Sequence, residues 1–106
     1  MPANERRLGS VSQIPSGEGR AFEVAGRRIA VFRNRQGALF ATQAECPHKG
    51  GPLADGLIGE TTVICPLHEW HFDLATGRLK SGECEIATYP VRASEDGQIL
   101  VTLQNG

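Results

Sequence analysis

Short runs of alternating or consecutive apolar residues recur along the chain. Residues 20–24, Arg-Ala-Phe-Glu-Val, alternate between polar and apolar side chains. Ile29, Val31 and Phe32 place β-branched and aromatic side chains in the next run. Such runs are typical of strands. The pattern predicts strands over residues 20–24, 28–33, 38–43, 61–64, 86–91 and 99–103.

Turn-forming residues separate several of these predicted strands. Turns are expected at residues 25–26, 34–37 and 95–97, each of which contains a glycine. No segment keeps apolar residues at helical spacing long enough to predict a helix. The fold class is therefore predicted as all-β, a small antiparallel β-sandwich or barrel. With 106 residues, the chain is expected to form a single domain over residues 1–106.

Charge is nearly balanced overall but unevenly distributed. The formal net charge is −1, yet residues 1–35 contain seven arginines and three glutamates. The basic segment suggests either a docking face or scattered solvated arginines. The overall balance gives no reason to expect a nucleic-acid or membrane partner. No apolar run approaches the roughly 20 residues of a membrane span, and the N-terminus does not resemble a signal peptide. A cytoplasmic location is expected.

Cysteine and histidine occur as two close pairs in turn-rich segments. Cys46-Pro-His48 is followed, after sixteen residues, by Cys65-Pro-Leu-His68. Cys84 brings the cysteine count to three, an odd number that argues against a disulfide framework. Two such pairs are hard to explain as buried cysteines that happen to neighbour surface histidines. They predict a metal site with ligands Cys46, His48, Cys65 and His68.

Two metal centres suit two cysteines and two histidines. A structural zinc site is one. However, zinc fingers usually pair Cys with Cys and His with His, whereas each pair here is mixed. A mixed pair is expected if each loop reaches two different metal atoms. That arrangement suits a 2Fe–2S cluster with cysteine on one iron and histidine on the other.

The two pairs resemble the paired ligand motifs of Rieske iron–sulfur proteins. The resemblance extends to Gly51-Pro-Leu53, to the segment from Trp70 through Gly77, and to Tyr89-Pro-Val91, so it covers most of residues 20–103. It implies a Rieske-type fold with two cluster-binding loops. It also implies that Cys46 and Cys65 bind the inner iron, and that His48 and His68 bind the outer one.

A filled ligand set predicts an electron carrier without an activity of its own. The four protein positions on iron leave no open site for a substrate. With two neutral imidazoles in place of thiolates, the cluster carries less negative charge than a four-cysteine cluster, so its reduction potential is higher. The chain is therefore expected to be an electron-transfer component of a larger oxidoreductase system.

Within the Rieske family, two systems fit the sequence. Residues 82–92, Gly-Glu-Cys-Glu-Ile-Ala-Thr-Tyr-Pro-Val-Arg, look more like the small subunit of assimilatory NAD(P)H nitrite reductase. The alternative is the ferredoxin component of a ring-hydroxylating dioxygenase system. Expected partners are a large nitrite reductase subunit, or a flavin-dependent NAD(P)H reductase and a dioxygenase. Respiratory members carry an additional cysteine in each ligand loop, and this chain does not.

Four further residues are not expected to be metal ligands. Cys84 is expected to be a small buried residue, because the ligand set is complete without it. His71 is expected on the surface of a strand. Trp70 would either cover the cluster or simply pack. Glu69, which follows His68 directly, would oppose reduction slightly if it lies near the cluster.

Overall fold

The structure, a computed structural model, describes residues 5–46, 52–65, 70–80 and 84–103. Strands dominate this part of the chain, and two short 3-10 helices, η1 and η2, connect some of them. The elements are β1 (Glu5–Ser10), η1 (Val11–Gln13), β2 (Glu18–Val24), β3 (Arg27–Arg33), β4 (Leu39–Gln43), η2 (Leu53–Asp55), β5 (Leu57–Ile58), β6 (Thr62–Ile64), β7 (His71–Asp73), β8 (Thr88–Tyr89), β9 (Val91–Ala93) and β10 (Gln98–Thr102).

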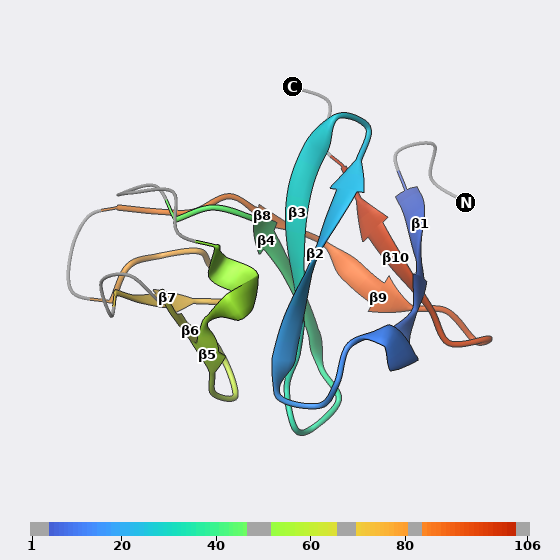
Figure 1. Cartoon of the computed structure of the whole chain (residues 1–106), viewed down its shortest axis with the longest axis horizontal. Coiled ribbons are helices and arrows are strands. Elements are labelled where there is room, and N and C mark those ends of the chain that lie inside the picture. The colour runs from blue at the N-terminus through green and yellow to red at the C-terminus, as the bar shows by residue number, and fades with distance from the viewer. Residues whose placement is uncertain (1–4, 47–51, 66–69, 81–83, 104–106) are drawn as a thin grey trace.

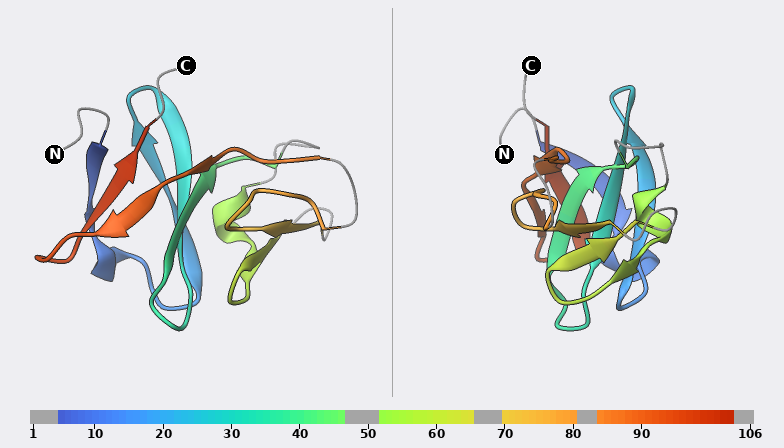
Figure 2. Two further views of the ribbon diagram at one scale, coloured as in Figure 1. Left: turned by 180° about the vertical axis from the view of Figure 1, so that it is seen from behind. Right: turned by 90° about the vertical axis from the view of Figure 1, so that its left-hand side faces the viewer.

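Three antiparallel sheets follow one another along the molecule (Figures 1 and 2). The central sheet has the order β2-β3-β4-β8. One outer sheet, β1-β10-β9, contains the first and last described strands. The other outer sheet, β5-β6-β7, lies at the opposite end. The all-β, antiparallel prediction is confirmed.

The β2–β3 hairpin shows how local sequence produces the central sheet. Strand pairing runs from Glu18↔Arg33 to Val24↔Arg27. The two residues between the strands, Ala25 and Gly26, have φ values of 50° and 79°. Two consecutive residues in the left-handed region match the twist of a two-residue hairpin. Gly26 adopts this conformation readily, whereas Ala25 does so at some energetic cost.

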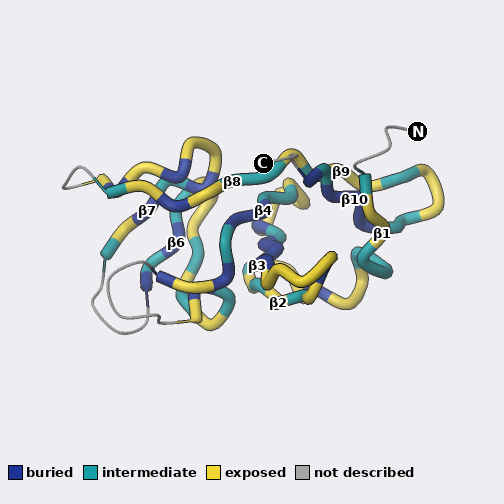
Figure 3. Tube along the Cα trace, turned by 90° about the horizontal axis from the view of Figure 1, so that it is seen from above, coloured by how far each residue is buried: buried dark blue, intermediate teal, exposed yellow. Residues whose placement is uncertain are grey.

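β3 is buried on both faces and divides the interior into two cores. Ile29 and Val31 belong to a core shared with the β1-β10-β9 sheet, which we call the base core. Ala30 and Phe32 belong to the second core, which we call the cysteine core. Successive strand residues point to opposite faces, so one strand supplies both cores. The burial-coloured trace shows β3 between the two outer units (Figure 3).

The predicted strand over residues 86–91 is wrong as a single element. β8 ends at Tyr89 and β9 begins at Val91, and Pro90 lies between them. β8 pairs with β4, whereas β9 pairs with β10 in a different sheet. Pro90 has no N–H to continue a ladder, and its carbonyl instead accepts a hydrogen bond from the Thr102 N–H at 2.8 Å.

The remaining strand predictions are confirmed with small shifts at their ends. The predicted turns also form. Gly37 and Gly97 donate backbone hydrogen bonds to the Asn34 and Ser94 carbonyls, each at 3.0 Å. The Ser94 hydroxyl hydrogen-bonds the Asp96 carboxylate and lowers the pKa of that carboxyl group. The sequence reasoning missed β1 and β5 altogether.

Neither 3-10 helix in the described ranges has the length and apolar character that crossing a lipid bilayer requires.

Candidate metal centre

The first cysteine–histidine loop leaves the central sheet at the end of β4. The Leu53 N–H donates to the Ala44 carbonyl at 2.9 Å, and Glu45 forms a bridge with Pro52. These contacts close the base of the loop, and Cys46 is the first residue beyond them. These contacts therefore hold the backbone immediately before Cys46 in place.

The second loop leaves the β5-β6-β7 sheet between β6 and β7. Ile64 pairs with His71 in this sheet, and the Cys65 N–H donates to the Trp70 carbonyl at 2.9 Å. The hairpin base thus ends at Cys65 on one side and at Trp70 on the other. Cys65 occupies in its loop the same position that Cys46 occupies in the first.

The two cysteine side chains are buried in one core. Cys46 and Cys65 are each 1% exposed and belong to the cysteine core. The structure joins neither of them, nor Cys84, by a disulfide. A buried thiolate is costly without a compensating positive charge, and a metal supplies that charge. Two buried thiols in one core, each at the start of a loop whose sequence next offers a histidine, therefore fit a metal centre with a mixed donor set.

The predicted histidine ligands, His48 and His68, lie outside the described residues, as does Glu69. Within the described ranges, no group of three or more potential metal-ligating side chains is found. The structure thus brings Cys46 and Cys65 to one core, and the complete four-residue set stays a prediction.

A third hairpin segment borders the cysteine core. Leu79 pairs with Phe72 of β7, and its N–H donates to the Cys84 carbonyl at 2.9 Å. Cys84 is half-buried and packs against the core, so it is less buried than expected. Trp70 also packs there, with its ring centroid 6.2 Å from that of Phe72. His71 is exposed on β7, as predicted.

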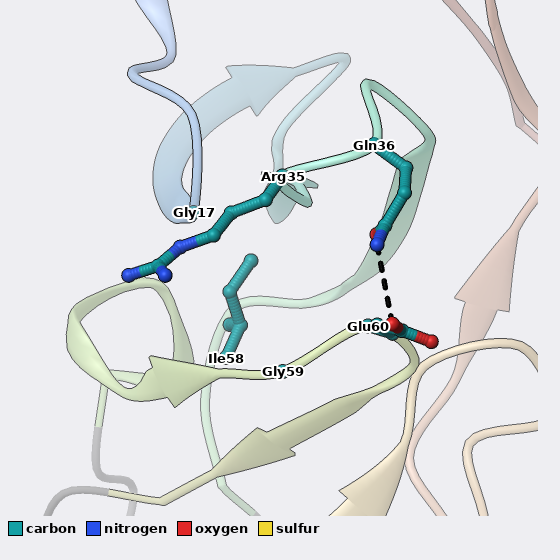
Figure 4. A pocket seen from close by; sticks show the side chains of 6 residues that line it. All are labelled: Gly17, Arg35, Gln36, Ile58, Gly59 and Glu60. Carbon is teal, nitrogen blue, oxygen red and sulfur yellow. Dashed lines mark hydrogen bonds between the residues drawn. The ribbon is translucent and has the colours of Figure 1, made fainter.

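A pocket lies between the β3–β4 turn and the β5–β6 hairpin (Figure 4). It has a volume of about 340 Å³, and among the described residues its lining includes neither Cys46 nor Cys65. The side chain of Gln36 reaches across to Glu60, with Nε2 donating to Oε1 at 3.1 Å. Nearby, the buried Asn34 side chain donates to the Glu60 carbonyl at 2.7 Å. These contacts attach the β3–β4 turn to the β5–β6 hairpin.

Sequence reasoning missed two polar residues that organise this end of the molecule. Asn34 joins the central sheet to the segment that carries the second loop. Gln43 makes side-chain hydrogen bonds to the Glu45 carbonyl and to the Ala87 N–H. Asn34 begins the turn predicted at residues 34–37, and its Oδ1 accepts from the Gln36 and Ala38 N–H groups. No sequence signal, however, identifies its contact with Glu60 or the contacts of Gln43.

Comparison with known proteins decides which metal centre the chain contains. Residues 4–90 match the Rieske [2Fe-2S] domain family. The chain belongs to this family. The Rieske prediction and its 2Fe–2S cluster are confirmed, and the zinc alternative loses its support.

Relatives of the Rieske domain come from several redox systems, among them a nitrite reductase and a dioxygenase system. The chain is 41% identical over 86 residues to nitrite reductase [NAD(P)H] of Emericella nidulans, covering 72% of this chain. It is 31% identical over 93 residues to the ferredoxin component of the naphthalene 1,2-dioxygenase system of Pseudomonas aeruginosa, covering 86% of this chain. A solved structure described as an NADH-dependent nitrite reductase small subunit from Mycobacterium tuberculosis has a TM-score of 0.89 at 21% identity, covering 96% of each chain.

The relatives differ greatly in how much of their own length this chain covers. The chain spans 88% of the dioxygenase ferredoxin. It spans only 8% of the nitrite reductase and 21% of a 4beta-methylsterol monooxygenase from Methylococcus capsulatus. The shared element is the Rieske electron-transfer domain, and the activities of the longer proteins are not carried over with it.

Proposed function

We propose that this Rieske domain is the small electron-transfer component of an NAD(P)H-dependent nitrite reductase. The observation that carries this proposal is the 41% identity to the nitrite reductase domain. The sequence of residues 82–92, which includes Cys84, also looks more like the nitrite reductase type than like a dioxygenase ferredoxin. A solved structure described as a nitrite reductase small subunit has the same fold.

We infer that Cys46, His48, Cys65 and His68 hold the 2Fe–2S cluster, with the cysteines on the inner iron and the histidines on the outer one. When bound, the cluster accepts and releases one electron. Cys46 and Cys65 anchor it, and their burial beside Phe72 and other apolar side chains keeps water from the thiolate side. The chain itself would therefore transfer electrons without transforming a substrate.

A second candidate function is the ferredoxin component of a ring-hydroxylating dioxygenase system. It is favoured by length, because the chain spans 88% of the naphthalene dioxygenase ferredoxin. In that case the partners would be a flavin-dependent NAD(P)H reductase and a dioxygenase, in place of a large nitrite reductase subunit.

A reconstitution experiment separates the two functions. The purified protein is offered first to a large nitrite reductase subunit with NAD(P)H and nitrite, and then to a flavin reductase and dioxygenase pair. We expect NAD(P)H-driven nitrite reduction to be accelerated by the intact chain and to fall with His48→Ala. The isolated chain should turn over neither nitrite nor an aromatic substrate.

Two outcomes would change this assignment. Acceleration of dioxygenase turnover, with no effect on nitrite reduction, would establish the second candidate. If neither partner accepts electrons from the reduced protein, both proposed systems are wrong.

A further inference from the structure

Gln43 connects the first cysteine–histidine loop to a segment far away in the sequence. It is the last residue of β4, and its side chain is half-buried. Its Nε2 donates to the Glu45 carbonyl at 2.7 Å, and its Oε1 accepts from the Ala87 N–H at 2.8 Å. The backbone N–H of Gln43 also donates to the Ala87 carbonyl, at 2.9 Å. Gln43 therefore makes two hydrogen bonds to Ala87 across this junction and a third to Glu45 at the start of the loop.

The first of these contacts acts directly on Cys46. The Glu45 carbonyl belongs to the same planar peptide unit as the Cys46 N–H. A hydrogen bond to that oxygen fixes the tilt of the peptide plane, and with it the direction in which Cys46 leaves the backbone. It also polarises the Cys46 N–H, because hydrogen bonds on the two ends of an amide reinforce one another.

The second contact leads towards the other loop. Ala87 follows Ile86, whose N–H donates to the Gly77 carbonyl at 2.7 Å. The same hairpin reaches β7 through the Lys80 N–H, which donates to the His71 carbonyl at 2.8 Å. β7 begins next to Trp70, whose carbonyl accepts from Cys65. The Gln43 amide thus joins the two cysteine-bearing segments through a series of hydrogen bonds.

We propose that Gln43 is a positioning residue for the 2Fe–2S cluster, acting through the Glu45–Cys46 peptide. Its amide sets the position of Cys46 relative to the hairpin that supports Cys65. This inference rests on the proposed assignment of Cys46 and Cys65 as ligands. The role requires a side chain that donates at one end and accepts at the other, which an amide of this length provides.

Two substitutions separate the donor from the acceptor. Gln43→Leu removes both side-chain hydrogen bonds at similar size. Gln43→Glu keeps an acceptor for the Ala87 N–H but cannot donate, and it places a carboxylate oxygen against the Glu45 carbonyl. Gln36→Leu is the matched control, because Gln36 also donates through Nε2 but to Glu60, whereas the Gln43 side chain bonds the peptide that precedes Cys46.

Two measurements report directly on the cluster. Cluster loss is recorded as bleaching of visible absorbance under an iron chelator, and the reduced proteins are compared by EPR. Substituting residues that orient metal ligands typically costs about 10–100-fold in metal affinity. We expect both Gln43 variants to lose the cluster about 10-fold faster than wild type and to show shifted g values. Gln36→Leu should match wild type in both measurements.

Thermal unfolding of the metal-free proteins distinguishes positioning from general stability. If the Gln43 variants unfold at lower temperature but keep the wild-type EPR signal, the hydrogen bonds are only structural and the proposal is wrong. Wild-type bleaching rates and g values in both variants would also overturn it. A wild-type protein that binds no cluster would instead refute the ligand assignment on which the proposal rests.

Discussion

Cys46 and Cys65 are buried in the same apolar core, each 1% exposed. Apolar side chains pack around them, with Leu53, Val63 and Phe72 in the same cluster. An apolar site disfavours a thiolate unless a cation is bound to it. At the scale of single residues, the cluster and the folding of this core are therefore coupled, because metal binding contributes directly to folding free energy.

Replacing one buried ligand should remove the cluster and destabilise the cysteine core. Cys65→Ser is expected to abolish the visible absorbance and to reduce iron and acid-labile sulfide from about two of each per chain to near zero. The unfolding temperature should fall with them, because the metal no longer holds the loops. Elemental analysis, sulfide analysis and circular dichroism melting measure the three effects.

Cys84→Ser provides the matched control for this experiment. Cys84 packs against the same core but is only half-buried, and the proposed ligand set does not include it. Its substitution should leave the spectrum unchanged. Loss of the cluster in this variant would contradict the ligand assignment, and one zinc per chain without sulfide in the wild type would contradict the cluster itself.

The candidate cysteine and histidine ligands could be recognised from sequence because few other side chains bind soft metals. The pairs Cys46/His48 and Cys65/His68 therefore stood out by residue type and spacing alone. Gln43 and Asn34 could not be identified in this way. Glutamine and asparagine occur at many surface positions, and the partners that connect these two residues to other segments, Ala87 and the Glu60 carbonyl, lie far along the chain.

Short elements next to the second cysteine–histidine loop pack closely against one another. The β5–β6 hairpin pairs Leu57 with Ile64, immediately before Cys65. Gly56 precedes this pair, and its backbone approaches the Ile64 carbonyl so closely that an added Cβ would overlap the oxygen. A glycine here permits the contact that aligns β6 with η2.

Gly56→Ala should therefore be strongly destabilising for steric reasons. The overlap is with backbone, which cannot rotate away as a side chain would. Overpacking of this kind typically costs about 1–3 kcal/mol, or several degrees in unfolding temperature for a chain of this size. Thermal melting followed by circular dichroism measures the effect, and faster cluster loss should accompany it.

Gly59→Ala is the control on the same hairpin. A Cβ at Gly59 would meet no other atom within 4 Å, and its backbone is not in the left-handed region. The substitution should leave the unfolding temperature nearly unchanged. Equal destabilisation by both substitutions would show that backbone flexibility, and not the Ile64 contact, is the reason for glycine at these positions.

Composition, more than length, decided which strands could be predicted from sequence. β2, β3 and β4 have enough β-branched and aromatic residues to show a strand pattern, and Gly26 marks the hairpin between β2 and β3. β1 has six residues but Leu8 is its only large apolar one, and β5 has only two residues, so neither shows a pattern. The division of residues 86–91 at Pro90 depends on which sheet each half joins, and local sequence does not contain that information.

At the scale of the whole molecule, the two cores have different structural roles. The base core joins β1, β9 and β10 to the central sheet, and the cysteine core contains both predicted thiolate ligands. β3 contributes to both cores. The central sheet, which the first loop leaves at β4, is therefore held on its other side by packing against the β1-β10-β9 sheet. Such support suits an electron carrier, because fixed ligands change little in geometry between the oxidised and reduced forms.

The reduction potential is a property of the whole domain, and we expect it near the lower end of the Rieske range, about −150 mV. The high-potential respiratory proteins have a disulfide joining their ligand loops and a serine after the second loop's histidine. This chain has no additional cysteine in either loop, and Glu69 follows His68. Fewer groups would withdraw electron density from the cluster, and we expect the carboxylate that follows a ligand in the sequence to disfavour the added electron.

Redox titration of the purified protein, followed by visible absorbance, measures this potential. Glu69→Gln should raise it, because the substitution removes one negative charge and keeps the side-chain size. Glu60→Gln is the control, since Glu60 hydrogen-bonds Gln36 and does not adjoin a candidate ligand in the sequence, and it should leave the potential unchanged. A wild-type value on the order of +300 mV would contradict the prediction, because it would require strong hydrogen-bond donors to the cluster in place of the missing disulfide and serine.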